Sequence, residues 1–264
     1  MITIKNKQEI AVLRRGGKKL AMVMEKLKSL CRPGASTAEL EDCAVGEIRK
    51  IGGRPSFLQY RSRHETNAYP TALCVSINEE IVHAPALPAR ILRAGDIVGL
   101  DIGMEYPWAD GQSGLYTDMA ATVPVGQVSE EAKKLIALTE KSLRAAIAVA
   151  RPGAWLFDIG RAVEKTVAGS GFSIVRDLVG HGVGYAVHEE PNVPNYVPRE
   201  KNFFNLRLKS GMVLALEPMI NAGGPEITLA ADGFTIRTAD GRLSAHFEHT
   251  IALTADVCRV ITSL

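Results

Sequence analysis

The stretch LCRPGA at residues 30–35 decides the predicted fold, because it recurs as VARPGA at residues 149–154. Helical hydrophobic patterns precede the two copies, over residues 7–30 and 129–150, and further helical patterns follow them, over residues 36–50 and 156–169. Proline followed by glycine cannot continue a helix, so each copy predicts a corner between two helices. The chain therefore contains a faint internal repeat of helix pairs.

Each predicted helix pair ends at a glycine-marked break, at residues 52–53 and 169–171, after which strand patterns follow. Four polar residues stand where they can cap the helices: Asn6, Ser36, Thr37 and Ser129. Two helix–helix–strand halves predict a pseudo-twofold α+β fold in which helices cover an antiparallel sheet. The length allows one or two domains, and we expect a single domain over residues 1–264.

Four acidic residues lie inside apolar, strand-like runs, where acids do not normally belong: Asp101, Asp118, Glu217 and Glu248. Burying an unpaired carboxylate costs several kcal/mol, so such groups pair, become protonated or bind metal. No lysine or arginine is embedded in the four runs. Taken singly, each acid can instead cap a strand end or face solvent.

Two histidines, His181 and His188, stand seven positions apart in the segment GHGVGYAVHEEP at residues 180–191. Glycines on both sides of His181 allow backbone and ligand to approach its imidazole closely. Four carboxylates and one neutral imidazole carry four negative charges, which two divalent cations balance. Such an oxygen-rich set with one nitrogen suits Mn, Fe, Co or Zn.

The ordered segments DIGM, YTDMAATVPVG, GHGVGYAVHEEP, MVLALEPMI and SAHFEHTIALT resemble the type I methionine aminopeptidases over essentially the whole chain. The segments NKQEIAVLRRGGKKLAMV and RPGASTAEL also resemble the first two helices of that family. The resemblance implies the duplicated "pita-bread" fold, with a metal site on the sheet between its halves. It implies that Asp101 binds one metal with both carboxylate oxygens and that Asp118 and Glu248 bridge the two metals. His181 and Glu217 would complete the coordination of the second metal.

The resemblance also implies roles for residues that face the substrate. His83 and His188 match the family's two substrate-facing histidines; we expect His188 to donate to the developing oxyanion and His83 to hold the scissile amide nitrogen. Glu217 is expected to move a proton from the attacking water to the leaving amine. The expected methionine pocket contains Phe57, Tyr69, Cys74, Val187 and Phe234. We expect no catalytic role for His64, His246 and His249.

The sequence departs from the family in its pocket and in two loops. Phe57, Val187 and Phe234 stand where a smaller residue, a phenylalanine and a tryptophan are usual. The loops 61–67 and 103–115 are longer than expected, and Asp110 in the second is a rival metal ligand. Asp118 is preferred because the residues after it continue as a strand, whereas Asp110-Gly111 is typical of a turn.

The implied activity is metal-dependent removal of the initiator methionine from nascent proteins and peptides, with a water activated by two ions of Co, Mn, Fe, Ni or Zn. One alternative is an Xaa-Pro aminopeptidase or prolidase, which shares the five ligands but usually has a large N-terminal domain. Another is a non-catalytic binding protein that kept the fold, in which we would expect ligands to be lost.

Composition limits the partners and the compartment. The net charge of +2 gives no reason to propose nucleic-acid binding. A basic cluster that includes Lys5, Lys7, Arg14, Arg15, Lys18 and Lys19 is expected to be a solvated helix face, with docking on the ribosome as the alternative. The start has no apolar signal region, no run approaches the ~20 apolar residues of a membrane span, and four cysteines form no C-x-x-C. We expect a cytoplasmic monomer that acts on nascent-chain N-termini.

Overall fold

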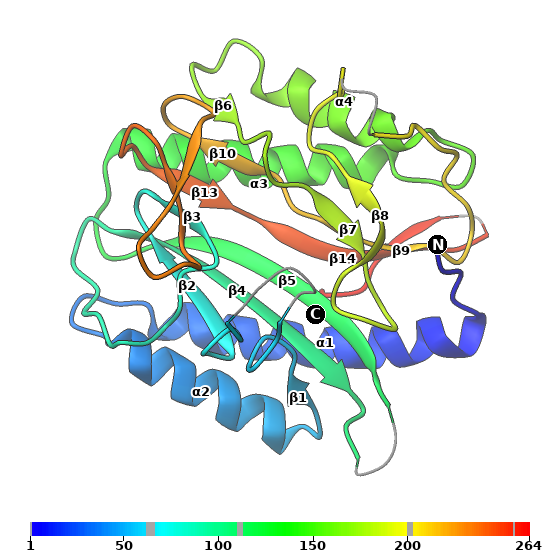
Figure 1. Cartoon of the computed structure of the whole chain (residues 1–264), viewed down its shortest axis with the longest axis horizontal. Coiled ribbons are helices and arrows are strands. Elements are labelled where there is room, and N and C mark those ends of the chain that lie inside the picture. The colour runs from blue at the N-terminus through cyan, green and yellow to red at the C-terminus, as the bar shows by residue number, and fades with distance from the viewer. Residues whose placement is uncertain (1, 62–66, 110–112, 200–202, 256) are drawn as a thin grey trace.

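A computed structural model describes residues 2–61, 67–109, 113–199, 203–255 and 257–264. Within these ranges it has four helices: α1 (Lys7–Leu30), α2 (Thr37–Lys50), α3 (Glu130–Val149) and α4 (Leu156–Val167). Each boundary agrees with the predicted helix to within two residues. Figure 1 shows α1 and α2 below the central strands and α3 and α4 above them. None of the helices in the described ranges is long and apolar enough to cross a membrane.

Three of the four predicted caps are formed. The side chains of Asn6, Ser36 and Ser129 each accept a hydrogen bond from a backbone N–H in the first turn of α1, α2 and α3. Thr37 has a different role, because its hydroxyl donates to the carbonyl oxygen of Ala86 at 2.6 Å and accepts from the backbone N–H of Arg90. It therefore ties the start of α2 to the segment that leads into the sheet.

The strands are antiparallel throughout the described ladders. The main sheet has the order β1-β4-β5-β14-β9-β7-β8, with β2 also paired to β4 and β15 to β14. Its strands are β1 (Arg54–Pro55), β2 (Leu73–Ile77), β4 (Ile97–Tyr106), β5 (Leu115–Pro124), β7 (Gly180–Gly182), β8 (Glu189–Val193), β9 (Val213–Leu216), β14 (Glu248–Leu253) and β15 (Cys258–Val260). A second sheet has the order β13 (Ser244–His246), β10 (Met219–Asn221), β6 (Ser173–Ile174). A third sheet has the order β11 (Ile227–Leu229), β12 (Ile236–Thr238), β3 (Glu80–Val82).

The two corners of the repeat have the same conformation. Gly34 and Gly153 both have φ +87°, a left-handed conformation that suits glycine. Their N–H groups donate to the carbonyl oxygens of Leu92 and Leu208, in each case at 2.8 Å. The halves meet where β5 pairs with β14, with Ala120 opposite Glu248. The predicted pseudo-twofold fold with an antiparallel sheet and covering helices is thus confirmed.

The alternation of side chains along β4 determines which face of the sheet carries charge. Leu100 and Ile102 are fully buried in a core with α1 and α2, through residues such as Leu20 and Met24. Successive side chains on a strand point to opposite faces, so Asp101 points away from these helices. A second core packs α3 and α4 against β9 and β14. The helices therefore leave the opposite face of the sheet for the candidate site.

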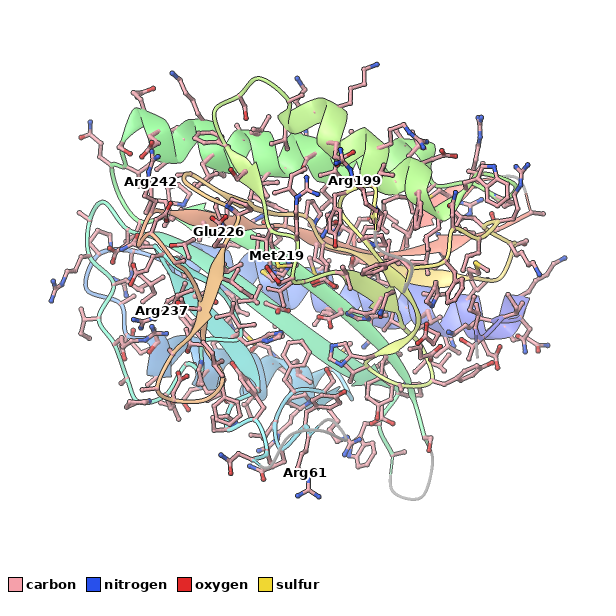
Figure 2. All side chains as sticks on the ribbon, turned by 45° about the horizontal axis from the view of Figure 1, so that its top comes forward. Arg61, Arg199, Met219, Glu226, Arg237 and Arg242 are labelled. Atoms are coloured by element: carbon pink, nitrogen blue, oxygen red, sulfur yellow. The ribbon has the colours of Figure 1, made fainter. Side chains whose placement is uncertain are left out.

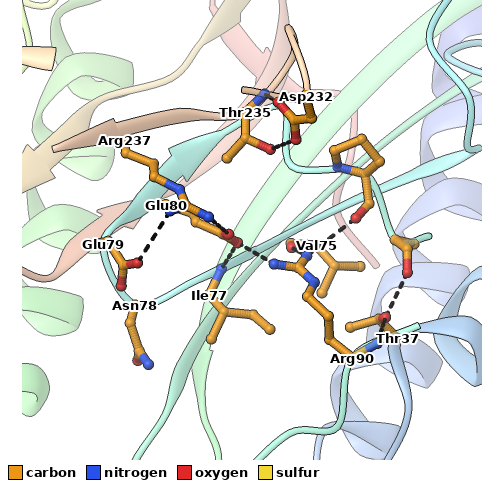
Figure 3. Close-up of polar contacts among 12 residues, drawn as sticks. Thr37, Val75, Ile77, Asn78, Glu79, Glu80, Arg90, Asp232, Thr235 and Arg237 are labelled. Atoms are coloured by element: carbon orange, nitrogen blue, oxygen red, sulfur yellow. Dashed lines mark hydrogen bonds and ion pairs between the residues drawn. The ribbon is translucent and has the colours of Figure 1, made fainter. Parts of the chain in front are cut away.

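A buried carboxylate joins the strands beside that site. Glu80 on β3 accepts from Arg90 at 2.6 Å, from Arg237 on β12 at 3.0 Å and from the backbone N–H of Ile77 at 2.8 Å (Figure 3). These bonds hold β3, which ends directly before His83, against β12, which follows the loop that carries Phe234.

The connection between β4 and β5 is shorter than the predicted loop over residues 103–115. Gly103 pairs with Asp118 and Tyr106 pairs with Leu115, because the two strands continue as a hairpin. Asp110 in this connection and His64 in the other predicted loop lie outside the described residues.

Candidate metal centre and active site

A cavity of about 750 Å³ lies on the face of the sheet opposite the helices. All five predicted metal ligands line it: Asp101, Asp118, His181, Glu217 and Glu248. None of the described residues that line it is a lysine or an arginine. Met219, which is labelled near the centre of Figure 2, also lines this cavity.

Neighbouring strands bring the four acids together. Asp101 lies on β4, Asp118 on β5 and Glu248 at the first residue of β14, and these strands are adjacent in the sheet. Glu217 follows β9, on the other side of β14. Adjacent strands are about 4.8 Å apart, so the four carboxylates, which lie on the same face of the sheet at neighbouring positions, come close together.

His181 on β7 is held in the tautomer that suits a metal ligand. Its Nδ1 lies 2.9 Å from the carbonyl oxygen of Gly182, so Nδ1–H donates there and Nε2 keeps its lone pair. Nε2 lies 3.4 Å from Oε1 of Glu217. The flanking glycines serve the neighbouring strands, because a Cβ at Gly182 would lie 2.3 Å from the carbonyl oxygen of Glu190. The backbone of neighbouring segments thus lies close to the two glycines that flank His181.

The donor atoms fit a divalent cation. Ligand atoms of Asp118, His181 and Glu248 lie within 4.8 Å of one another. One oxygen of each acid is buried without a hydrogen-bond partner: Oδ1 of Asp101, Oδ1 of Asp118, Oε1 of Glu217 and Oε1 of Glu248. Orphaned buried acceptors are costly, and a hard or borderline cation would satisfy all four.

The electrostatics point in the same direction. Burial, reinforced by the neighbouring carboxylates, raises the pKa of Asp101, Glu217 and Glu248 well above the usual range. Burial raises the pKa of Asp118 to about 7 and lowers that of His181 to about 4. The imidazole is therefore neutral at pH 7, while the carboxylates need either protons or metal.

We expect Asp118→Asn to stabilise the metal-free protein relative to the wild type, increasingly so as pH rises from about 4 to 7. Below about 4 the Asp118 carboxyl is protonated in both the folded and the unfolded chain. Above that pH the folded chain keeps a proton that the unfolded chain has released, so the wild type loses up to about 1.4 kcal/mol of unfolding free energy per pH unit.

Urea titrations of both chelated proteins at several pH values measure this difference, and the comparison cancels the contributions of the histidines. A difference in unfolding free energy that does not change between pH 4 and 7 would show that the Asp118 carboxyl is not desolvated.

The two histidines predicted to face substrate also line the cavity. His188 lies in the loop between β7 and β8, where its Nδ1 is 2.8 Å from the hydroxyl of Tyr60 and its ring centroid is 4.5 Å from that of His181. His83 follows β3 with φ +59°, a left-handed conformation that costs a non-glycine residue about 1–3 kcal/mol. Such strain is typical of functional positions.

Lys5 differs from the prediction of a solvated basic cluster. It precedes α1 and is only 2% exposed, because its Nζ pairs with Glu189 at 2.6 Å. Glu189 also accepts from the backbone N–H groups of Tyr185 and Ala186. The N-terminal segment therefore braces the loop that carries His188. Lys7, Arg14, Arg15 and Lys18 are exposed, as predicted.

The predicted pocket residues form one apolar cluster beside the acids: Phe57, Tyr69, Cys74, Val187 and Phe234. Four of them line the cavity, and the rings of Tyr69 and Phe234 meet edge to face with centroids 5.5 Å apart. Val187 packs in the same cluster but lines a neighbouring cavity of about 300 Å³.

His246, for which no catalytic role is expected from the sequence, lies next to one of the predicted ligands. His246 is 2% exposed, its Nε2 has no hydrogen-bond partner, and this atom lies 3.8 Å from Oε2 of Glu217. Its position two residues before Glu248 was the available signal, since alternate strand residues share a face. His249, the residue after Glu248 on β14, points to the other face of the sheet, and its Nδ1 lies 3.0 Å from the hydroxyl of Thr262.

Comparisons with known proteins agree with this geometry. Residues 11–255 match the profile of metallopeptidase family M24. The chain is 42% identical to methionine aminopeptidase 1 of Bacillus subtilis over 99% of both chains. It superimposes on the crystal structure of methionine aminopeptidase from Thermotoga maritima with a TM-score of 0.90, at 35% identity and over 100% of both chains.

A more distant match separates fold from activity. The prolidase of Pyrococcus horikoshii gives a TM-score of 0.74 at 18% identity, over 98% of this chain but 63% of that chain. That likeness shows the fold alone. The full-length matches and the family profile show that this chain belongs to metallopeptidase family M24.

Proposed function

We propose that this protein removes the N-terminal methionine from nascent proteins and peptides, using two divalent ions of Co, Mn, Fe, Ni or Zn. Its relatives at about 40% identity over nearly their full length are named methionine aminopeptidases. The observation that carries the proposal is the convergence of orphaned carboxylate oxygens and a neutral imidazole in a cavity with an apolar side. We further propose that residues 1–264 form a single catalytic domain.

The five predicted ligands, Asp118 and Glu248 among them, would hold the ions. When bound, a pair of such ions lowers the pKa of a shared water and so supplies hydroxide near neutral pH. Glu217 takes the proton of the attacking water and passes it to the leaving amine. The raised pKa of the Glu217 carboxyl, which results from burial, suits it to hold a proton.

The histidines orient the substrate and stabilise charge. A Tyr60 hydroxyl that donates to Nδ1 of His188 leaves the ring proton on Nε2, which then donates to the carbonyl oxygen as it becomes negative. His83, which also lines the cavity, holds the amide nitrogen of the first peptide bond. The apolar cluster of Phe57, Tyr69, Cys74 and Phe234 takes the methionine side chain.

We place the protein in the cytoplasm as a monomer that acts on N-termini as they leave the ribosome. The exposed basic residues of α1 could face an acidic ribosomal surface during such docking. Loss of ribosome co-sedimentation after reversal of these charges would support this contact.

The substrate assignment is tested with the purified, metal-depleted protein on three peptides: Met-Ala-Ser, Leu-Ala-Ser and Ala-Pro-Ser. With Mn, Fe or Co restored, we expect Met-Ala-Ser to have the highest kcat/KM. Leucine has as many side-chain heavy atoms as methionine but is shorter and branched, and an apolar pocket separates such similar side chains by only about 1–3 kcal/mol. Cleavage of Leu-Ala-Ser should therefore be slower but still measurable.

The outcomes distinguish the alternatives. A tenfold preference for Ala-Pro-Ser would replace the proposal with an Xaa-Pro aminopeptidase. No turnover of any of the three peptides with any of the five metals would support a non-catalytic binding protein.

A further inference from the structure

The pseudo-twofold axis relates two pairs of residues at the site. On the first half, Gly103 of β4 pairs with Asp118 of β5; on the second, Met219 of β10 pairs with His246 of β13. Asp101 lies two residues before Gly103, as Glu217 lies two residues before Met219. His246 therefore stands to Glu217 as Asp118 stands to Asp101.

A pair of threonines confirms that the two backbones are held in the same way. The N–H of Asp118 donates to Oγ1 of Thr250 at 2.9 Å, and that hydroxyl donates back to the carbonyl oxygen of Asp118 at 2.7 Å. The N–H of His246 donates to Oγ1 of Thr122 at 2.9 Å, and that hydroxyl donates back to the carbonyl oxygen of His246 at 2.9 Å. The backbone of His246 is therefore fixed relative to the site by the same pair of hydrogen bonds as the backbone of Asp118.

The surroundings of His246 limit what it can do there. It is buried and is not among the residues that line the cavity, so it does not reach the substrate. A buried imidazole nitrogen without a partner costs about 1–3 kcal/mol, and the carboxylate oxygen facing it is Oε2 of Glu217 at 3.8 Å. Oε1 of the same carboxylate faces Nε2 of His181 at 3.4 Å. Glu217 therefore lies between two imidazoles, one at each oxygen.

We propose that His246 is a positioning residue for Glu217. Its Nε2–H donates to Oε2 of Glu217 after a closure of less than 1 Å, which leaves Oε1 directed, with Nε2 of His181, at the cation. Groups that hold a metal ligand in this way typically change metal affinity by about 10–100-fold when they are removed. The inference rests on the proposed metal site, and metal binding can be measured without a substrate.

The test is a calorimetric titration of Co²⁺ into the metal-depleted protein, with the visible absorption of bound Co²⁺ as a second readout. We expect His246→Ala to raise the Kd of one ion by about 10–100-fold. His246→Gln keeps an N–H donor at a similar reach and should restore the Kd to within a few-fold. The same two substitutions at His249, which points away from the site, are the matched controls and should leave the Kd unchanged. If the alanine variant does not fold, His246→Asn, whose amide is too short to reach Glu217, replaces it.

A double-mutant cycle with Glu217→Gln separates positioning from direct ligation. If His246 acts through Glu217, His246→Ala adds no further loss of Co²⁺ affinity in the Glu217→Gln background. Additive losses, a glutamine variant as weak as alanine, or a wild-type Kd in His246→Ala would each overturn the inference. A wild type that binds Co²⁺ but cleaves no peptide would instead refute the proposed function and leave the inference standing.

Discussion

Asp118→Asn should reduce peptidase turnover by roughly several hundred-fold or more, because the side chain is expected to bridge both ions of a two-metal centre. Among the described residues, its carboxylate belongs to the one cluster, with the imidazole of His181 and the carboxylate of Glu248, whose donor atoms lie within 4.8 Å of one another. The asparagine has nearly the same volume but one charge fewer and only one ligating oxygen. The loss should therefore appear in kcat and in the metal content of the purified protein together. Glu248→Ala should behave in the same way.

The measurement is kcat/KM for Met-Ala-Ser with metal analysis of each variant. Asp42→Asn makes the same chemical change at an exposed position of α2 and should leave both quantities unchanged. Full activity of Asp118→Asn would refute the dinuclear assignment and return attention to Asp110, the rival candidate in the sequence.

The fold could be predicted because its signals are local. A Pro-Gly pair stops a helix wherever it stands, so the recurrence of RPGA located all four helix boundaries around the two corners. The acids of the site were visible for the same reason, since Asp101 interrupts an apolar alternation whose neighbours Leu100 and Ile102 pack against helices.

What sequence could not provide depends on contacts between distant segments. Lys5 resembles the other basic residues near it, and only its partner Glu189, far along the chain, explains its burial. The spacing of His246 from Glu248 is visible in the sequence, but its relation to Glu217 appears only when the register of β10 and β13 is compared with that of β4 and β5. Val187 belongs to the pocket cluster but faces a second cavity, a distinction that requires the loop geometry.

His188→Ala should reduce kcat by roughly 10²–10³-fold while the metal content stays normal, as expected for the loss of one oxyanion donor. The structure supports the separation of roles, because Nδ1 of His188 is engaged by the Tyr60 hydroxyl, whereas His181 lies beside Glu217 among the ligands. His181→Ala should therefore lose metal as well as activity. Tyr60→Phe keeps the ring but removes the hydroxyl that orients His188, and its smaller loss should fall on kcat rather than on metal content.

The comparison of His188→Ala with His181→Ala is the decisive one, because the two rings are neighbours and either could have been the nitrogen ligand. The Nδ1–H of His181 donates a hydrogen bond to the carbonyl oxygen of Gly182, so the lone pair of Nε2 is available to bind a cation. On the tautomer proposed for His188, Nε2 carries the proton and cannot bind metal. Equal loss of metal in the two alanine variants would mean that His188 is a ligand. Another residue that lines the cavity would then donate to the carbonyl oxygen, with His83 as the first candidate.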